Sequence, residues 1–306
     1  MEVFVSLIIL QQTLTMLLLM GTGVVLTRIG ILDDAVSSAL GKLLVSCIIP
    51  CVTLNSFMVP MKEGGLGLLG QSAILGMASL AIAMAVSYII FSRREPEQDF
   101  GAAFSNAGFV GIPLVSATFG KEAVFYIAPM ISFLNILQWT YGEWLLTGDS
   151  RKVQLKSVLL NPVLIATVMG ILLYATQLPV PGIVSRSVEM LADTNTPIAM
   201  LVLGSYLAKT QPKSLVADVR VWAGSIVRLF VVPLATALLI RLSGMGNSEM
   251  VQALFIASAA PVGANVAIFA QQCGADYRLS VRLVCLSTLL SVMSVPIVFQ
   301  LFSCLV

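Results

Sequence analysis

The chain contains long segments without any charged side chain. Five such segments run over residues 3–27, 64–92, 157–185, 250–275 and 283–306. Each is long enough to cross a bilayer as a helix, because a crossing takes roughly 20 predominantly apolar residues. This pattern predicts an all-α membrane protein that crosses the bilayer several times.

Charge clusters and Gly/Pro positions predict ten transmembrane helices joined by short connections. We expect the helices at 4–26, 36–58, 66–91, 100–119, 123–146, 158–177, 187–207, 217–241, 250–272 and 282–304. Ten crossings use nearly all of the 306 residues and leave no room for a separate extramembrane domain. No basic residue precedes the first apolar segment, so we expect a retained first helix and not a cleaved signal peptide.

Lys and Arg are unevenly distributed among the connections. The connections after helices one, three, five, seven and nine hold eleven of them: Arg28, Arg93, Arg94, Arg151, Lys152, Lys156, Lys209, Lys213, Arg220, Arg278 and Arg282. The other connections hold Lys62, Lys121, Arg186 and Arg241. Because cytoplasmic connections are enriched in Lys and Arg, this pattern predicts a plasma membrane (bacterial inner membrane) protein with both termini outside.

The most polar connection divides the chain into two halves. We expect five helices in residues 1–147, a cytoplasmic linker at 148–157 and five helices in residues 158–306. Since five is odd, the second half enters the membrane with the opposite orientation. Inverted repeats of this kind occur in secondary transporters, whose substrate sites lie between discontinuous helices of the two halves.

Helix-breaking residues occur at matching places in the fourth and ninth expected helices. Pro removes a backbone N–H, and Gly leaves helical geometry at low cost. Within the hydrocarbon such a break is tolerated only where it faces protein or water. The candidate substrate-binding residues at the breaks are Asn106, Gly108, Pro113, Pro261, Gly263 and Asn265. The alternative is a pair of kinks used only for packing, since Pro and Gly are frequent in membrane helices.

Three charged residues inside the expected helices are candidates for binding or ion coupling. Arg228 is near the centre of the eighth helix and is expected to bind a carboxylate substrate, to link two helix bundles, or to form a permanent ion pair with Asp193. Asp193 is the candidate acid for carrying a proton or binding a cation. Lys42 lies close enough to a helix end for its side chain to reach water.

The composition argues against most enzymatic functions. Only 10% of the residues are charged, 58% are hydrophobic, and there is no histidine. His-based catalysis and imidazole metal ligands are therefore absent. The five cysteines include no Cys-x-x-Cys pair and predict no metal site, and a net charge of +2 without a dense basic cluster predicts no nucleic-acid partner. We expect a protein that is not an enzyme and has no cofactor.

Several motifs occur in an order that resembles one family. Ser105-Asn106 precedes Val110-Gly111-Ile112-Pro113-Leu114, and Ala259-Ala260-Pro261-Val262-Gly263 leads to Ile268-Phe269-Ala270. Weaker matches are Asn161-Pro162, Lys42 with Pro50, Asp193 with Leu203-Gly204, and Arg228 with Pro233. Across almost the whole chain, this combination resembles the auxin efflux carrier family, which includes bacterial organic-acid permeases and the plant PIN-FORMED carriers.

The resemblance implies a fold related to the bile-acid/sodium symporters and sodium/proton antiporters. In that fold, helices four and nine cross as broken helices in a transport domain of helices 3–5 and 8–10. This domain moves against a scaffold of helices 1, 2, 6 and 7. The resemblance also implies that a small organic anion binds near the crossing and that two copies form a homodimer through the scaffold.

Individual positions carry the resemblance to the plant carriers only in part. Asn106 matches their substrate-facing asparagine, and Asn161 matches the start of their asparagine-proline motif. The chain departs from them at Val163 and Ala264, where the plant carriers have Asn and Pro, and it lacks their long central loop. The resemblance therefore implies anion binding at the crossing but neither auxin as the substrate nor regulation through that loop.

The leading hypothesis is a secondary transporter that moves a small carboxylate by alternating access. One alternative is a symporter of the same fold in which a proton or a sodium ion is the coupling ion. Another is a membrane protein that senses the anion without transporting it. The near-absence of extramembrane sequence argues against the sensor, because it leaves no domain for a signalling partner.

Overall fold

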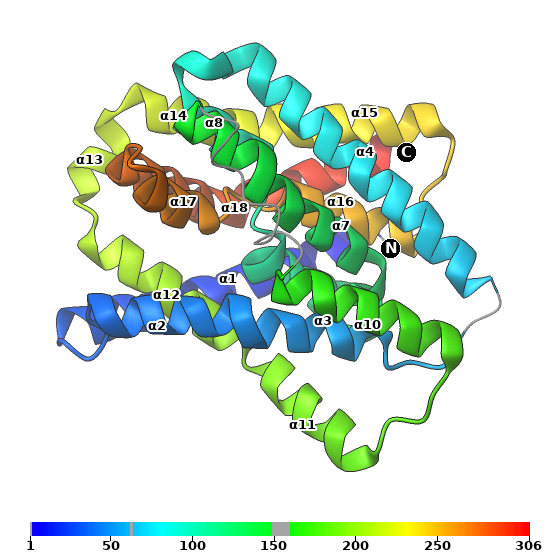
Figure 1. Ribbon diagram of the computed structural model, residues 1–306. Helices are drawn as coiled ribbons and strands as arrows, with labels where there is room; N and C mark the ends of the chain where they lie inside the picture. Colours follow the sequence, from blue (N-terminus) through cyan, green and yellow to red (C-terminus); the bar gives the residue numbers. More distant parts are fainter. Residues whose placement is uncertain (1, 62–63, 149–159) are drawn as a thin grey trace.

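The computed structural model describes residues 2–61, 64–148 and 160–306 as a bundle of helices (Figure 1). Six helical stretches are long and apolar enough to cross a membrane: Val5–Arg28, Asp34–Phe57, Gly65–Phe91, Lys121–Thr147, Val219–Ser243 and Tyr277–Leu305. Shorter apolar helices lie at Ala107–Phe119, Pro162–Thr176 and Glu249–Ala259. The prediction of an all-helical membrane protein is therefore confirmed, while most of the expected linker at 148–157 lies outside the described residues.

The first half contains eight α-helices, some of them segments of one longer helix. They are α1 (Glu2–Arg28), α2 (Asp34–Leu43), α3 (Ile49–Phe57), α4 (Gly65–Phe91), α5 (Pro96–Ala103), α6 (Ile112–Phe119), α7 (Val124–Leu137) and α8 (Glu143–Thr147). The π-helical turns η1 (Leu44–Ile48), η3 (Ala107–Gly111) and η5 (Gln138–Gly142) join α2 to α3, precede α6, and join α7 to α8.

The second half contains the remaining described helices. Its helices are α10 (Pro162–Thr176), α11 (Gly182–Asp193), α12 (Asn195–Lys209), α13 (Pro212–Ala217), α14 (Val219–Ile226), α15 (Val232–Ser243), α16 (Glu249–Ala259), α17 (Asn265–Cys273) and α18 (Tyr277–Leu305). The π-helical turn η7 (Val227–Val231) joins α14 to α15.

Prolines explain three of these wide turns. Pro50, Pro113 and Pro233 each follow the last residue of a π-helical turn by two positions. A proline inside a helix lacks an N–H and clashes with the carbonyl of the preceding turn, and a local widening of the helix relieves that clash. The prolines therefore bend these helices without ending them.

The expected single helix at 187–207 is divided in the structure. It ends as α11 at Asp193 and restarts as α12 at Asn195, and Figure 1 shows α11 turned away from the bundle. The Thr194 hydroxyl donates to the carbonyl oxygen of Leu191 at 2.6 Å and so satisfies a carbonyl at the end of α11. None of the side chains of α11 is buried.

The connections gather at two opposite ends of the bundle. At one end, which we call the basic end, Lys209 pairs with Asp34 at 2.6 Å and Arg282 pairs with Asp218 at 3.1 Å. The described basic residues there are Arg28, Arg94, Lys209, Lys213, Arg220, Arg278 and Arg282. At the opposite end, Lys121 pairs with Asp193 at 2.6 Å. Every second connection along the chain thus lies at the same end, and the Lys/Arg pattern predicts this arrangement.

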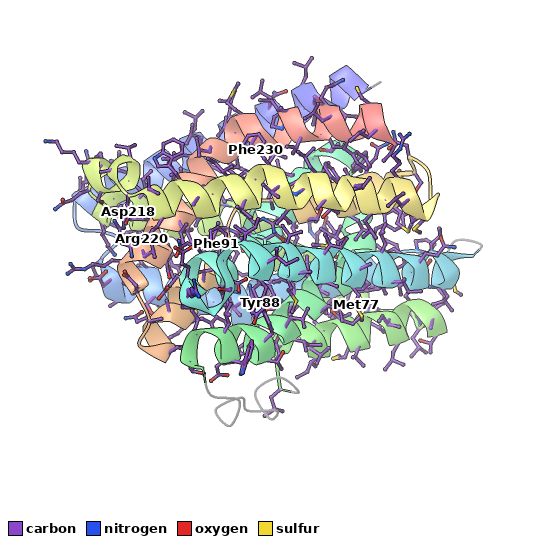
Figure 2. All side chains as sticks on the ribbon, turned by 90° about the horizontal axis from the view of Figure 1, so that it is seen from above. Met77, Tyr88, Phe91, Asp218, Arg220 and Phe230 are labelled. Atoms are coloured by element: carbon purple, nitrogen blue, oxygen red, sulfur yellow. The ribbon has the colours of Figure 1, made fainter. Side chains whose placement is uncertain are left out.

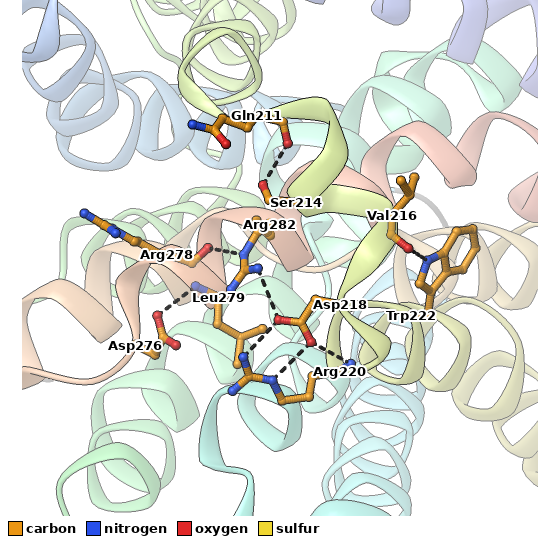
Figure 3. A network of polar contacts seen from close by, with 10 residues as sticks. All are labelled: Gln211, Ser214, Val216, Asp218, Arg220, Trp222, Asp276, Arg278, Leu279 and Arg282. Atoms are coloured by element: carbon orange, nitrogen blue, oxygen red, sulfur yellow. Dashed lines mark hydrogen bonds and ion pairs between the residues drawn. The ribbon is translucent and has the colours of Figure 1, made fainter.

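A polar network joins the starts of α14 and α18 at the basic end (Figure 3). The Asp218 carboxylate accepts from the Arg220 guanidinium at 2.9 Å and from Arg282. The hydrogen bond from Arg220 holds the pKa of the Asp218 carboxyl below its ordinary value. Asp276 accepts from the backbone N–H of Leu279 and thereby caps the start of α18.

Large apolar side chains cover much of the outer surface. Met77 and Tyr88 on α4 are 48% and 41% exposed, and Figure 2 shows both on the same helix beside α15. Ile89, Ile183 and Leu242 are at least 77% exposed. An aqueous protein rarely leaves so much apolar surface open, whereas lipid tails match it. The protein is therefore a multi-pass membrane protein.

Close contact between α1 and α12 depends on glycine. A Cβ on Gly23 would lie 2.9 Å from the Cα of Leu201, and one on Gly204 would lie 2.9 Å from the Cα of Gly23. These neighbours are backbone atoms, which cannot move aside as a side chain can. Small residues let membrane helices pack at short distance in this way.

We expect Gly23→Val to separate α1 from α12 and to destabilise the protein by about 1–3 kcal/mol, the usual cost of overpacking. The measurement is the melting temperature of the purified protein in detergent. Gly21→Val is the matched control, because Gly21 lies on the same helix with nothing within 4 Å of an added Cβ. Equal melting temperatures for the two variants would contradict this account of the packing.

Candidate functional site

The two predicted helix breaks lie against each other. α5 ends at Ala103 and α16 ends at Ala259, and the extended residues that follow form an antiparallel bridge between Ser105 and Val262. The backbone N–H of Asn106 donates to the carbonyl oxygen of Pro261 at 2.7 Å, and the N–H of Gly263 donates to that of Phe104 at 3.0 Å. The backbone groups freed by the breaks therefore satisfy one another inside the membrane.

Gly263 and Pro261 allow the two breaks to approach. A Cβ on Gly263 would lie 3.2 Å from the carbonyl oxygens of both Phe104 and Ser105. The N–H of Val262 donates to the Ser287 hydroxyl of α18 at 3.1 Å. Both predicted residues thus build the crossing through their backbone, and their side chains supply no polar group.

The two asparagines at the breaks differ in their surroundings. The side-chain oxygen Oδ1 of Asn106 accepts from the backbone N–H of Phe109 at 3.4 Å and so caps η3. Its amide nitrogen is buried and has no hydrogen-bond partner among the described residues. Asn265 is the first residue of α17 and is half-buried, and its amide nitrogen donates to Gln138 of η5 at 3.0 Å.

Arg228 binds the two helix ends that meet at the crossing. Its Nε donates to the carbonyl oxygen of Ala260, and its Nη1 donates to that of Ala102, both at 3.0 Å. The C-terminal end of a helix carries partial negative charge, so one buried guanidinium stabilises the ends of both α5 and α16. The expected ion pair of Arg228 with Asp193 is wrong, because Asp193 pairs with Lys121 at the opposite end.

The starts of the broken helices are left without a comparable neutralising group. Asn106 caps η3, but no side chain caps α17, which begins at Asn265. A helix N-terminus carries partial positive charge and unpaired N–H groups, and this combination attracts anions. The crossing therefore has neutralised C-terminal ends and one N-terminal end without a side-chain cap, where the N–H groups of Val266 and Ala267 donate to the carbonyl oxygens of Gly263 and Ala264.

A cavity of about 780 Å³ leads from the basic end to Asn265. α2, η1, α12, α17, the start of α18 and the junction of α7 with η5 form its walls, which carry Lys42, Ser46, Asn135, Trp139, Tyr206, Asn265, Phe269, Gln271 and Gln272. The lining thus contains amide and hydroxyl groups together with aromatic rings. Such a lining suits a small ligand that has both a charged and an apolar part.

The charged groups of this cavity favour an anion. Asp34 is its one acidic residue among those described, and it pairs with Lys209. Lys42 is exposed to the cavity, and no ion pair of this residue occurs among the described residues. One positive charge is therefore left over among the described residues that line the cavity with Asn265.

A second cavity of about 290 Å³ lies at the opposite end. Pro113, Asn195 and Asp193 line it, together with Lys121. Asp193 is 50% exposed and accepts from Lys121, which also pairs with Glu189 at 3.5 Å. Asp193 thus lies at a solvent-exposed ion pair and not beside the crossing.

The remaining predicted residues lie between the cavities or apart from them. The carbonyl oxygen of Gly108 accepts from the amide of Asn195 at 3.2 Å, so η3 is fastened to the start of α12. Asn161 is buried and caps α10 by accepting from the N–H of Val163 at 2.9 Å. Its contacts are those of an ordinary helix cap, with Pro162 at the first helical position.

The structure adds residues that the sequence did not single out. Gln138 holds Asn265, Asn135 and Trp139 line the large cavity, and Asn195 binds Gly108. The only sequence signal for Asn135 and Gln138 is that they are polar residues in an apolar segment, three positions apart. Residues three apart share a helix face, so this spacing could have marked a polar face on the fifth helix.

Comparisons with known proteins agree with these features. Residues 149–299 match the model of a family described as "Membrane transport protein". The chain is 24% identical over 303 residues to a protein of Methanothermobacter thermautotrophicus named "Uncharacterized transporter", covering 94% of this chain and 96% of that protein. It is also 24% identical over 209 residues to a Rhizobium meliloti protein named "Putative malonate transporter", covering 65% and 64% of the two chains. The resemblance found in the sequence motifs is thus confirmed, because residues 149–299 match the membrane transport protein family, that of the auxin efflux carriers, and both relatives are named as transporters.

Proposed function

We propose that the protein is a secondary transporter of a small organic anion, with malonate as the first substrate to test. The observation that carries the proposal is the 780 Å³ cavity, which leads to Asn265 at the start of α17, where no side chain caps the helix, and is lined by Lys42, which has no ion pair in the described part of the chain. A carboxylate there would receive a hydrogen bond from the Asn265 amide and would lie in the partial positive charge of the helix start and the full charge of Lys42. The name of the Rhizobium meliloti relative supports a dicarboxylate. The family is one of transporters, so the protein is not an enzyme.

The proposed mechanism is alternating access around the crossing. The large cavity is open at the basic end, while Asn195 binds Gly108 and Lys121 pairs with Asp193 toward the opposite end. This asymmetry fits one of two orientations of a moving domain. In terms of the ten helices expected from the sequence, we assign the movement to helices three to five (residues 66–146) and eight to ten (residues 217–304). The scaffold consists of helices one and two (residues 4–58) and six and seven (residues 158–207).

The same proposal includes the architecture expected from the sequence. Residues 1–147 and 158–306 would form two inverted five-helix repeats, and the basic end would face the cytoplasm with both termini outside. Matching breaks in α5–α6 and α16–α17 support the repeat, and the Lys/Arg distribution supports the orientation. A homodimer through the scaffold completes it.

The test is counterflow in proteoliposomes, which exchanges internal unlabelled malonate for external labelled malonate. We expect Lys42→Gln to raise KM several-fold with little change in the maximal rate, because the variant removes a charge that attracts the free anion. Lys213→Gln is the control, since Lys213 is exposed at the same end but does not line the cavity. Wild-type protein that binds malonate without any counterflow would favour the sensor instead.

A further inference from the structure

Asp99 is a buried carboxyl group that the anion site does not use. It lies in the first turn of α5 and is fully buried. Its Oδ2 has no hydrogen-bond partner, and no Lys or Arg forms an ion pair with it, among the side chains that the structure describes, which do not include that of Arg93. An ionised carboxylate in such a place lacks compensation, which costs several kcal/mol.

The hydrogen bonds around Asp99 fit a protonated carboxyl group. The Ser87 Oγ lies 2.6 Å from Oδ1 of Asp99 and 3.1 Å from the carbonyl oxygen of Met84. A hydroxyl has one hydrogen and cannot donate fully to both acceptors. If Oδ1 carries a proton, it donates to the Ser87 Oγ, and the hydroxyl donates to Met84. Both contacts are then complete hydrogen bonds.

The other charged and titratable groups around α5 have partners of their own or lie at the surface. On the elements packed against α5 they are Tyr88, Arg94, Tyr141, Glu143, Arg220, Arg228, Cys273, Tyr277, Arg278, Arg282, Cys285 and Cys304. Of these, Tyr141 is near enough to Asp99 for electrostatic interaction. Arg228 binds the two carbonyls at the crossing, and Arg220 and Arg282 pair with Asp218. The described cations therefore leave Asp99 without a counter-charge.

Asp99 is linked to the anion cavity through its neighbours. The ring of Phe100 lies 5.6 Å from that of Phe269, which lines the cavity. Phe100 also fills the space beside Gly142, where a Cβ would overlap its ring. Gly142 belongs to η5, the turn whose Gln138 holds Asn265. A change of charge at Asp99 thus acts on two elements that form the cavity wall.

We propose that Asp99 is the proton-binding residue of a proton-coupled anion carrier. Its carboxylate takes up one proton from water on one side of the membrane and releases it on the other side as the anion crosses. This inference rests on the proposed transport function and names its coupling ion. It also moves the coupling acid from the exposed, ion-paired Asp193 to Asp99, which has no counter-ion among the described side chains.

The experiment compares counterflow with accumulation of malonate driven by an acidic outside medium. Wild-type protein is expected to accumulate malonate under this gradient. In Asp99→Asn, the ratio of accumulation to counterflow is expected to fall to the wild-type ratio measured without a gradient. Asp33→Asn is the matched control, because Asp33 is an exposed helix cap at the same end and Asn caps a helix equally well.

The outcomes separate the two proposals. Absence of counterflow in the wild type overturns the transport function itself. Counterflow without gradient-driven accumulation in the wild type, or accumulation retained in Asp99→Asn, overturns the role of Asp99 alone.

Infrared spectroscopy provides a second measurement that needs neither transport nor a folded Asp99→Asn variant. A protonated, buried carboxyl group gives a carbonyl band distinct from that of carboxylates. We expect this band in the wild type at neutral pH, unchanged in Asp33→Asn and shifted to higher frequency in Ser87→Ala, which removes the hydrogen-bond acceptor. A spectrum without such a band, or a band that Ser87→Ala leaves in place, overturns the proposal.

Discussion

Replacing Arg228 by methionine is expected to abolish transport and to lower the melting temperature of the purified protein strongly. The substitution keeps much of the side-chain volume but leaves the carbonyl oxygens of Ala102 and Ala260 without their donor. Each buried carbonyl left unpaired costs roughly 1–3 kcal/mol. Relief from burying the guanidinium offsets part of this cost, since a buried charge is itself unfavourable. We expect the cost of the unpaired carbonyls and of the two uncompensated helix ends to exceed this relief, so that the free energy of unfolding falls.

The melting temperature and the counterflow rate of Arg228→Lys are expected to lie between those of Arg228→Met and those of the wild type. An ammonium group restores the positive charge, but it lacks the planar fork that lets one guanidinium donate in two directions. The measurements are thermal unfolding in detergent and malonate counterflow. Arg241→Met is the control, because Arg241 lies on the adjoining α15 but is exposed and binds the carbonyl oxygen of Leu305 at the opposite end. Similar melting temperatures for Arg228→Met and Arg241→Met would contradict the role assigned to Arg228.

The helices could be predicted from the sequence because the bilayer constrains it strongly. A charge-free segment of sufficient length has few alternatives to a membrane helix. For the same reason, Pro and Gly inside such segments marked the breaks after Ala103 and Ala259. The division at Thr194 was missed, because the break there rests on a hydroxyl–carbonyl contact and on α11 leaving the bundle.

The site could be predicted only in part, because sequence patterns reveal charges more readily than backbone dipoles. Arg228 was expected to need an acidic partner, whereas its partners are backbone carbonyls at helix ends. Asp99 could not be predicted as a buried residue, because it precedes the expected start of a helix at residue 100 and would be solvated there. In the structure α5 begins at Pro96, so the carboxyl group is buried in the first turn of a packed helix.

Replacing Asn265 by alanine is expected to lower kcat/KM for malonate counterflow by about ten- to a hundredfold, because a hydrogen bond to a charged group contributes roughly 1.5–3 kcal/mol. The effect should appear mainly in KM if Asn265 holds the anion equally throughout transport, and mainly in kcat if the contact forms only during the movement. Gln138→Leu should produce a smaller loss, since it removes the group that orients Asn265 but leaves the amide in place.

The structural contribution of Asn265 is separable from its contribution to binding. Asn265 is half-buried at the first position of α17 and caps no helix through its side chain, but alanine leaves the buried Gln138 oxygen without its donor, so we expect the melting temperature to fall by the equivalent of about 1–3 kcal/mol. Malonate should stabilise the wild type and Asn247→Ala, an exposed control at the opposite end, but not Asn265→Ala. If Asn265→Ala retained both malonate-induced stabilisation and counterflow, the anion would not bind at the start of α17. The positive charge of Lys42 would then be the remaining attraction, and the site would lie nearer the mouth of the cavity.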